Sequence, residues 1–203
     1  TPEERAFYAA AAFDIEYEFP FGWKELEGIH NRTNYDLSKH QEFSGKDLSY
    51  FDDQTREKFV PYIVGTSAGC DHTLLTTLVD AYDEDVVEGE ARTVLPLSPR
   101  IAPIKAGIFP LVKKGGMPEA AEKIYHSLKK HFNLFYDDGG AIGRRYRRMD
   151  EAGTPFGITI DGQTIEDQTV TVRDRDTLVQ ERVASDKLAA YMQEKMAAYR
   201  RKE

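Results

Sequence analysis

Alternating hydrophobic and polar positions near the start of the chain predict a β-hairpin. Over residues 13–19, FDIEYEF, every second position is apolar and the positions between are acidic, which is the pattern of a half-buried strand. Pro20 and Gly22 interrupt this pattern. A second extended segment over residues 24–32 follows, ahead of an Asp- and Ser-rich stretch from 36 to 53. Two strands joined by a short turn form a hairpin.

The spacing of apolar residues changes from strand-like to helical in the next part of the chain. A short apolar run covers residues 58–64, and the positions after Thr66 repeat with a helical period. We expect a helix that begins near Thr66, with Thr66 or Ser67 as its N-cap. The acidic, irregular segment 83–97 then predicts a linker. The apolar stripe of the helix consists of Leu74, Leu75, Leu78, Val79 and Tyr82.

Strands and helices alternate in the second half of the chain, in the order βαβαββα. This order predicts a compact α/β domain with a mixed sheet. On the helix over residues 142–151, we expect Ile142, Tyr146 and Met149 to face inward and the four arginines to face outward. The predicted elements are a strand at 102–112, a helix at 118–131, a strand at 133–138, the helix at 142–151, strands at 156–161 and 168–173 around a polar turn, and a helix at 185–201.

Composition favours a cytoplasmic protein with no membrane association. The chain of 203 residues is long enough for two compact units. It has no apolar run near the roughly 18 residues that would indicate a membrane span. Its first residues also lack the apolar region of a secretory signal. The single cysteine, Cys70, cannot form an internal disulfide, which fits a reducing compartment.

The charges are distributed unequally between the two halves. Residues 1–96 contain 8 Lys and Arg against 20 Asp and Glu, a net charge of -12, whereas residues 97–203 contain 19 against 15, a net charge of +4. Only the second half has the basic character that a phosphate backbone attracts. The asymmetry predicts two domains, 1–96 and 97–203, with different partners.

Four segments of the chain stand out: FPFGWKELEGIHNRTNYDL, APIKAGIFPLVKK, IGRRYRRMDEAGTPFGITID and TVTVRDRDT. Together they resemble the glycyl-tRNA synthetases of the dimeric, single-polypeptide type. The resemblance implies that residues 1–96 are the end of a class II antiparallel-sheet catalytic domain and that residues 97–203 are an α/β anticodon-binding domain. It also implies a fragment that does not aminoacylate tRNA by itself, because family chains are more than twice as long and class II motifs 1 and 2 have no match here.

The activity implied by the resemblance is ATP-dependent activation of glycine, followed by its transfer to tRNA(Gly). Mg²⁺ would accompany ATP, the full-length protein would be a homodimer, and no side chain would form a covalent intermediate. We expect no metal ion held by protein side chains, because Asp14, Glu16 and Glu18 fit one face of an acidic strand. The alternative is a non-catalytic, tRNA-binding paralogue of the synthetases.

Two segments carry the implied glycine and ATP site. Glu25 matches the family glutamate that helps to hold the amino group of glycine and the adenylate, a role that suits a carboxylate. The alternative is a solvated strand residue. Ser67 matches the serine that contacts the amino acid, and the small residues after it leave room for a ligand. The full implied set is Glu25, Leu26, Ser67, Ala68, Gly69, Cys70, Asp71 and His72.

Class II motif 3 is altered in this chain. The family writes it EPSAGVDR, whereas residues 65–72 read GTSAGCDH, with Gly65 in place of glutamate and His72 in place of arginine. An imidazole is shorter than a guanidinium and largely neutral near pH 7. Loss of such a preorganised cation usually costs about 10²-fold in rate. Either this protein compensates or activation is impaired. The alternative for His72 is a partly buried structural histidine.

Arginines of the second half are the predicted tRNA contacts. They can meet phosphates, and those of the RDRDT segment can also hydrogen-bond unstacked bases. The alternatives are a solvated helix face paired with Asp150 and Glu151, and cross-strand pairs within RDRDT, whose aspartates we expect to be structural. Phe156 and Tyr146 are expected in the core. The predicted tRNA-binding residues are Arg144, Arg145, Arg147, Arg148, Arg173 and Arg175.

Overall fold

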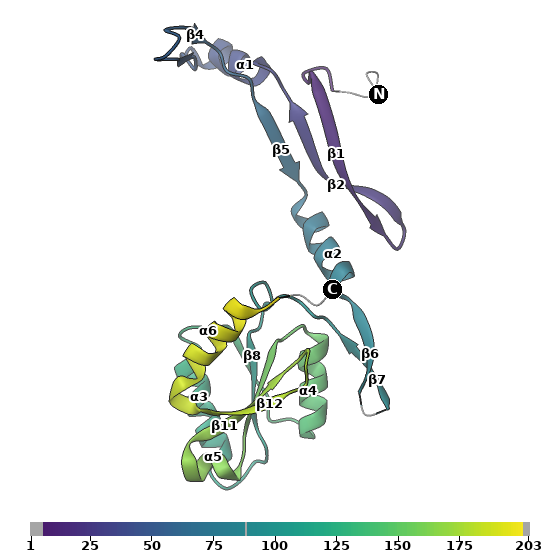
Figure 1. The fold of residues 1–203 in the computed structure, drawn as a ribbon, viewed down its shortest axis with the longest axis vertical. Coiled ribbons are helices and arrows are strands. Elements are labelled where there is room, and N and C mark those ends of the chain that lie inside the picture. Colours follow the sequence, from purple (N-terminus) through teal and green to yellow (C-terminus); the bar gives the residue numbers. More distant parts are fainter. Residues whose placement is uncertain (1–5, 88, 201–203) are drawn as a thin grey trace. The chain divides into compact units, whose positions relative to one another are not determined.

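The computed structural model describes residues 6–87 and 89–200, which form two compact units, residues 1–79 and 80–203 (Figure 1). The division after residue 79 differs from the boundary at 96/97 that the sequence suggested. The difference arises because residues 83–94 are not a linker. They form a hairpin of β6 (Asp83–Val87) and β7 (Glu90–Val94) that belongs to the C-terminal unit. The functional division into 1–96 and 97–203 stays a prediction.

The N-terminal unit contains a three-stranded antiparallel sheet in the order β1-β2-β5. The predicted hairpin is present as β1 (Ala11–Phe19) and β2 (Gly22–Asn31), and β5 (Val64–Ala68) pairs with the other edge of β2. A bulge between Ile15 and Glu16 shifts the β1–β2 register, so that Glu16 lies opposite Glu25. Bulges of this kind change which side chains share a face.

The Asp- and Ser-rich segment contains a helix that the sequence pattern did not predict. This helix, α1 (Tyr35–Ser44), has no buried residue, so it lacks the apolar stripe that reveals most helices. It ends at Gly45, whose φ of 68° places it in the left-handed conformation that terminates many helices. A short β3 (Tyr50–Phe51) and β4 (Lys58–Phe59) pair beyond it.

The helix expected from Thr66 begins later, at Cys70. Helix α2 (Cys70–Ala81) follows β5, in which Thr66 and Ser67 pair with Ile29 and Gly28 of β2. The expectation that Thr66 or Ser67 caps the helix is therefore wrong. The strand ladder takes up their backbone before the chain turns at Gly69.

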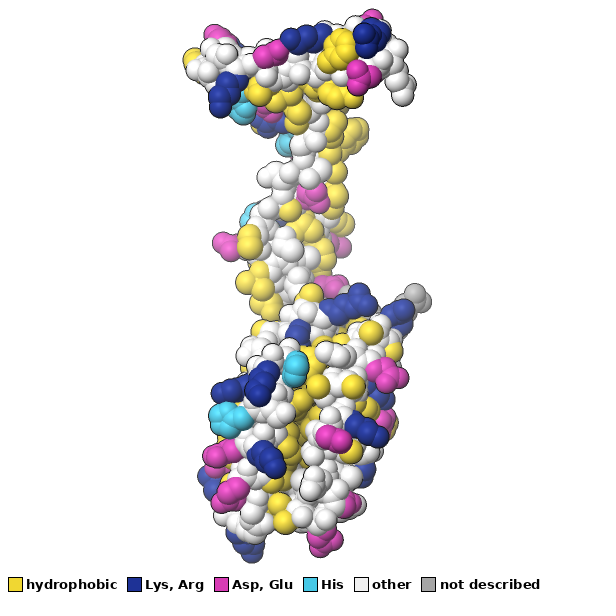
Figure 2. Space-filling view, turned by 90° about the vertical axis from the view of Figure 1, so that its left-hand side faces the viewer, with side chains coloured by type: hydrophobic (Ala, Val, Ile, Leu, Met, Phe, Trp, Pro, Cys, Tyr) yellow, Lys and Arg dark blue, Asp and Glu magenta, His cyan; other side chains and the backbone are white. Residues whose placement is uncertain are grey.

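The N-terminal unit has little core of its own. Within the described part of residues 6–79, Ala9 and Phe19 are the only buried hydrophobic side chains. The half-buried pattern expected for β1 is not realised at Phe13, which is 71 % exposed, and Trp23 of β2 is 60 % exposed. Hydrophobic side chains are visible at the surface of this unit in Figure 2. A sheet normally buries one face against another layer.

The C-terminal unit is built on a five-stranded mixed sheet in the order β12-β11-β10-β8-β9. The three strands β8, β9 and β10 are parallel, and β11 and β12 extend the sheet in antiparallel fashion. The mixed sheet is as predicted, although the sequence pattern did not reveal β12. The strands are β8 (Ala106–Pro110), β9 (Leu134–Tyr136), β10 (Phe156–Ile160), β11 (Thr169–Asp174) and β12 (Gln180–Ala184).

Helices cover both faces of this sheet. Because β8 lies between β9 and β10, right-handed crossovers place α3 and α4 on opposite faces, as Figure 1 shows. The predicted polar turn before β11 is instead a short helix, α5, held by a capping box between Asp161 and Thr164. The helices are α3 (Met117–Leu128), α4 (Ile142–Glu151), α5 (Gly162–Asp167), the 3-10 turn η1 (Ser185–Lys187) and α6 (Leu188–Ala198).

Two paired glycines let α4 approach the sheet closely. Gly107 of β8 and Gly157 of β10 lie directly opposite each other. A Cβ on Gly157 would lie 2.4 Å from Cε1 of Tyr146, and a Cβ on Gly107 would lie 2.3 Å from Cζ of Phe109. The rings of Phe109 and Tyr146 pack edge to face at 5.4 Å. The absence of two methyl groups therefore makes room for this aromatic pair.

We expect Gly157→Ala to lower the free energy of unfolding by about 1–3 kcal/mol, because the new methyl group must displace the partly buried Tyr146 ring. Urea denaturation of the chain measures this change. Gly143→Ala is the matched control, since no atom lies within 4 Å of a Cβ there and the position is helical. Its stability should be unchanged or rise by up to about 1 kcal/mol. Equal losses in both variants would contradict the packing argument.

Candidate functional site

The register of the N-terminal sheet brings residues of the implied glycine site together. Asp14 of β1 lies opposite Gly28 of β2, and Gly28 lies opposite Ser67 of β5. Residues directly opposite in antiparallel strands present their side chains on the same face. Asp14 and Ser67 therefore flank Gly28 in one row across three strands.

The side chain of Glu25, three residues before Gly28 on β2, also lies close to this row. A Cβ placed on Gly28 would lie 3.3 Å from Oε1 of Glu25, 3.6 Å from Oδ1 of Asp14 and 2.9 Å from Cε1 of His30. Because Gly28 has no side chain, the carboxylates of Glu25 and Asp14 can both lie close to it, and Ser67 lies opposite it on the neighbouring strand. Leu26, by contrast, is half buried and is skipped by the β1–β2 register.

Asp14 and Gly28 are positions that sequence reasoning did not connect with the site. Asp14 fitted an acidic strand face, and nothing in the local pattern marked Gly28. Their proximity to Glu25 depends on the bulge beside Ile15 and on the pairing of β2 with β5. Neither feature can be obtained from hydrophobic periodicity alone.

The altered motif 3 continues from β5 into the first turn of α2. Ala68, Gly69, Cys70, Asp71 and His72 are all exposed. The imidazole of His72 lies back over Gly69, because a Cβ on Gly69 would be only 3.2 Å from Cγ of His72. The exposure of His72 does not fit the alternative of a partly buried structural histidine.

Gly65 has a charged neighbour. A Cβ on Gly65 would lie 3.5 Å from Cδ of Arg32. The guanidinium of Arg32 donates to Asp36, with Nη2 at 3.0 Å from Oδ1, and lies 4.1 Å over the ring of Tyr8. The pKa of Asp36 is lowered by this hydrogen bond. The glutamate that the family motif has at this position would therefore stand next to an arginine that here has another carboxylate partner.

Two other kinds of site find no support in the described residues. No group of three or more His, Cys, Asp or Glu side chains in residues 6–87 and 89–200 is arranged to hold a metal ion. In the same part of the chain, no helix combines the length and the apolar character needed to cross a bilayer.

Arg145 is part of the interior of the C-terminal unit. Its side chain is only 3 % exposed and donates to the carbonyl oxygens of Pro110 at 2.6 Å and Gly140 at 2.8 Å. The expectation that all four arginines of α4 face outward is wrong here. Position 145 falls on the same helical stripe as Ile142, Tyr146 and Met149, so the helical period itself contained this signal.

The other arginines of α4 differ in exposure and in their hydrogen-bond partners. Arg148 is 46 % exposed and pairs with Asp137, while Nη2 also donates to the Gly139 carbonyl at 2.8 Å. Arg147 donates to the Ala91 carbonyl at 3.2 Å and lies 3.5 Å from Glu90, both in the β6–β7 hairpin.

Arg144 is exposed, and its side chain makes no hydrogen bond or ion pair with any residue that the structure describes. The partners of the α4 arginines are thus not the expected Asp150 and Glu151. We call Arg144 and Arg148 the outer α4 face.

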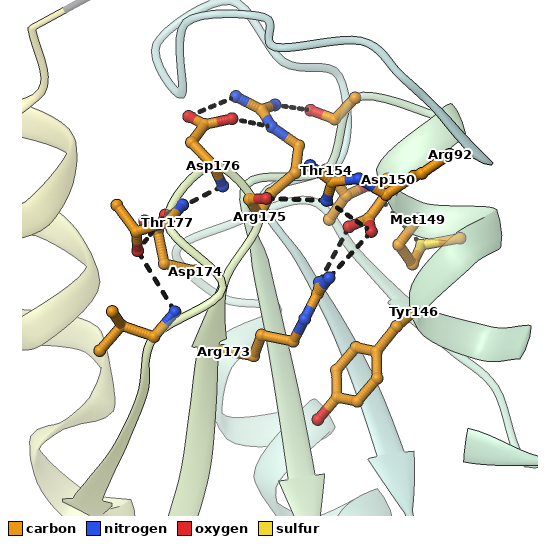
Figure 3. A network of polar contacts seen from close by, with 12 residues as sticks. Arg92, Tyr146, Met149, Asp150, Thr154, Arg173, Asp174, Arg175, Asp176 and Thr177 are labelled. Atoms are coloured by element: carbon orange, nitrogen blue, oxygen red, sulfur yellow. Dashed lines mark hydrogen bonds and ion pairs between the residues drawn. The ribbon is translucent and has the colours of Figure 1, made fainter. Parts of the chain in front are cut away.

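The two arginines of the RDRDT segment are held inside a polar network (Figure 3). Arg173 donates to both oxygens of Asp150, at 2.9 and 3.0 Å, and its guanidinium lies 4.8 Å over the Tyr146 ring. Arg175 is fully buried, pairs with Asp176, and donates to the carbonyl oxygens of Gly153 and Leu97 at 2.8 and 2.9 Å.

The aspartates of the same segment have structural roles, as expected. Asp174 accepts from the backbone amides of Asp176 at 3.0 Å and of Thr177 at 2.8 Å, and so holds the turn after β11. The donors of Arg173 and Arg175 are thus directed at protein acceptors. We therefore leave these two residues and Arg145 out of the proposed tRNA surface.

Arg92 is a member of this network that sequence reasoning missed. Its side chain is 3 % exposed and pairs with Asp85 of the same hairpin, with Asp150 of α4 at 3.1 Å and with the Arg175 carbonyl at 3.0 Å. The hydrogen bond from Arg92 lowers the pKa of Asp85. Arg92 lay in a supposed linker, and two of its partners are 58 and 83 residues away in sequence.

We expect Arg145→Met to lower the free energy of unfolding by about 1–3 kcal/mol, because the buried carbonyl oxygen of Pro110 loses its donor. Arg144→Met removes the same charge from the same helix and should change stability by no more than about 0.5 kcal/mol. Thermal or urea denaturation of both variants measures the difference. If Arg144→Met proved as destabilising as Arg145→Met, the assignment of their environments would be incorrect.

Comparison with known proteins shows which proteins the chain is similar to. Residues 102–195 match the anticodon binding domain family. The chain is 52 % identical over 194 residues to a glycine–tRNA ligase of Chlorobaculum tepidum, 53 % identical over 198 residues to one of Borreliella burgdorferi, and 55 % identical over 194 residues to one of Caldanaerobacter subterraneus. Each alignment covers 96 % of this chain but only 41 %, 44 % and 42 % of the respective relative, so the chain spans less than half of their length. The chain is therefore homologous to a portion of the glycine–tRNA ligases, and that portion includes an anticodon-binding domain.

Proposed function

We propose that this chain contributes to the ATP-dependent attachment of glycine to tRNA(Gly). Residues 1–96 would supply part of the activation site, and residues 97–203 would bind the anticodon region of the tRNA. The observation that carries the first part is the row of Asp14, Gly28 and Ser67, with Glu25 beside it. The relatives named glycine–tRNA ligase support the same assignment.

The geometry around Gly28 suits the ammonium group of glycine. Carboxylates at Glu25 and Asp14 offer charge-assisted hydrogen bonds to a small cation, and the Ser67 hydroxyl adds a neutral acceptor. Space beside Gly28 is limited, because a Cβ there would lie 2.9 Å from Cε1 of His30. A narrow site of this kind favours the amino acid without a side chain.

The chemistry requires placement more than covalent catalysis. In the activation step, the glycine carboxylate attacks the α-phosphorus of ATP and pyrophosphate leaves, with Mg²⁺ accompanying the nucleotide. The protein contributes by orienting the two reactants and by stabilising the charge that develops. We propose that residues 65–72 lie along the nucleotide, where the exposed amides at the start of α2 favour anionic groups and offset in part the loss of arginine at His72.

We assign the complete activity to a longer, cytoplasmic protein that acts as a homodimer. The chain spans 41–44 % of its relatives, and the apolar side chains of Phe13 and Trp23 stand exposed on its N-terminal sheet. Both observations support a catalytic domain whose remaining part covers these side chains and supplies class II motifs 1 and 2. On this proposal the present chain alone does not aminoacylate tRNA.

The proposed tRNA surface is the outer α4 face together with Lys113. Lys113 is exposed, and its Nζ lies 3.0 Å from Oδ2 of Asp138. The loops that follow β8 and β9 therefore meet at the carboxyl-end edge of the parallel strands. Ligands of open α/β sheets commonly bind at the carboxyl ends of parallel strands. Exposed cations at this edge can exchange their carboxylate partners for phosphate oxygens. Arg147 is a weaker candidate, because it contacts the hairpin.

A non-catalytic, tRNA-binding paralogue is the second candidate. The specific observation that favours it is the altered motif 3, in which Gly65 stands where the family has a glutamate and the nearby Arg32 is paired with Asp36. Such a protein would retain the outer α4 face and bind tRNA. It would not form glycyl adenylate.

Glycine-dependent exchange of pyrophosphate into ATP by the full-length protein separates the two candidates. We expect measurable exchange that falls by about 100-fold or more in Glu25→Ala, because the ammonium group loses a charged partner. Glu18→Ala, which removes an exposed carboxylate from the same hairpin, is the matched control and should retain full exchange. Absence of exchange in the wild-type protein, with tRNA binding intact, would establish the paralogue.

The tRNA surface predicts charge-dependent binding. We expect the double variant Arg144→Glu, Arg148→Glu to weaken tRNA(Gly) binding by about tenfold or more, and to reduce the salt slope of the affinity by about 1 for each lost phosphate contact. Lys129→Glu, Lys130→Glu changes the net charge equally at exposed positions beyond the far end of α3 and should leave the affinity within about twofold. If both double variants weaken binding alike, net charge rather than this surface governs association.

A further inference from the structure

The β6–β7 hairpin is joined directly to the helix that carries motif 3. Helix α2 begins at Cys70 and ends at Ala81, and β6 begins at Asp83, so Tyr82 is the only residue between them. Contacts that hold the hairpin in place therefore also hold the C-terminal end of α2 in place. The sequence pattern predicted a linker here, which would have left the connection between α2 and the C-terminal unit flexible.

The hairpin is held to α4 and to the turn after β11 by contacts that span more than 50 residues of sequence. Arg92 reaches Asp150 and the Arg175 carbonyl. From the opposite direction, Arg147 donates to the Ala91 carbonyl. The segment after the hairpin is fixed as well, because the Leu95 amide donates to the Asp150 carbonyl at 3.1 Å and Arg175 donates to the Leu97 carbonyl.

Arg92 is at the centre of these contacts, and the charged group to which it belongs has no net charge. Two guanidinium groups, Arg92 and Arg173, face two carboxylates, Asp85 and Asp150. Breaking a buried pair by removing one partner leaves an uncompensated charge, whereas the intact group is satisfied. Arg92 connects the hairpin, α4 and the turn after β11 at once. A lysine cannot reproduce this, since a single ammonium group lacks the planar fork of donors.

We propose that Arg92 is a positioning residue for the transfer of glycine to tRNA. By locking the β6–β7 hairpin to α4, it makes the exit of the motif 3 helix part of the same body that carries the outer α4 face. Arg92 touches neither ATP nor glycine in this scheme, and its effect is on how a tRNA bound at α4 is presented to the adenylate. The inference rests on the proposed function, because it assumes that the outer α4 face binds tRNA.

The test uses the full-length protein with Arg92→Met and, as a milder variant that keeps an acceptor next to Arg92, Asp85→Asn. Arg182→Met is the matched control: Arg182 also pairs with an aspartate, Asp161, but it lies on β12 and has no contact with the hairpin among the described residues. Hydrogen exchange of the amides in 83–87 and 89–95 reports the anchoring of the hairpin independently of activity.

We expect Arg92→Met to speed hydrogen exchange in the hairpin and to lower kcat for aminoacylation by about 5- to 30-fold. Glycine-dependent pyrophosphate exchange and the Kd for tRNA should both stay within about twofold of wild type, and Arg92→Lys should recover only part of kcat. Asp85→Asn should produce the same pattern with smaller changes, which keeps the test valid if Arg92→Met does not fold. Arg182→Met should leave both the hairpin and kcat unchanged.

Three results would overturn the inference. One is a hairpin loosened by Arg92→Met with unchanged aminoacylation, which would make Arg92 a purely structural residue. The other two are an equal loss of kcat in Arg182→Met and a parallel fall in pyrophosphate exchange and tRNA affinity in Arg92→Met, either of which would indicate general destabilisation. A wild-type protein that neither exchanges pyrophosphate nor aminoacylates tRNA would instead refute the proposed function. In that case the hydrogen-exchange result would still show whether Arg92 anchors the hairpin.

Discussion

The C-terminal unit depends on the burial of one carboxylate, Asp150, at the end of α4. A buried carboxylate is costly unless cations and hydrogen-bond donors surround it. Asp150 meets this requirement with two guanidinium groups that come from separate parts of the chain, Arg173 on β11 and Arg92 on the hairpin. Its backbone carbonyl also receives the Leu95 amide. Three segments therefore have to be in place before this one group is satisfied.

This constraint explains how the arginines of the unit divide between structure and surface. Arg173 and Arg175 lie on the segment that folds back toward Asp150, so their donors are used inside the protein, and Tyr146 closes the network beneath Arg173. Arg144 and Arg148 lie on the opposite side of α4, where Arg148 pairs with the partly buried loop residue Asp137. Cationic side chains that look equivalent in a sequence thus acquire different roles from the helix face on which they fall.

Much of the C-terminal architecture could be predicted from the sequence because its elements have strong periodic signals. Helix α3 has Ala121 and Leu128 on its buried stripe, and β8 and β10 consist of continuous buried residues. The elements that escaped prediction lack such a signal. Helix α1 buries nothing, β12 is a largely polar edge strand, and the acidic β6–β7 hairpin is stabilised by Arg92 through distant partners. Long-range ion pairs leave no local pattern.

The candidate glycine site shows the same limit at the level of single residues. Motif resemblance led to Glu25 and Ser67, but only the strand register, shifted by a bulge, shows that they share a face with Asp14 around Gly28. The helical period, in contrast, did contain the correct place of Arg145, on the stripe of Ile142 and Met149. That signal was overridden by the charge of the residue, although a buried arginine is acceptable wherever carbonyl oxygens can receive its protons.

The close approach of α4 to the sheet makes four positions depend on one another during evolution. Gly107 and Gly157 have no side chain, and the space this leaves is filled by the rings of Phe109 and Tyr146. The volumes of the two pairs are therefore complementary. A lineage could exchange a glycine for alanine only if an aromatic ring became smaller at about the same time. Among diverging descendants of this chain, these four positions should therefore change together or remain fixed, and a drift at one of them would mark the domains in which the helix has moved away from the sheet.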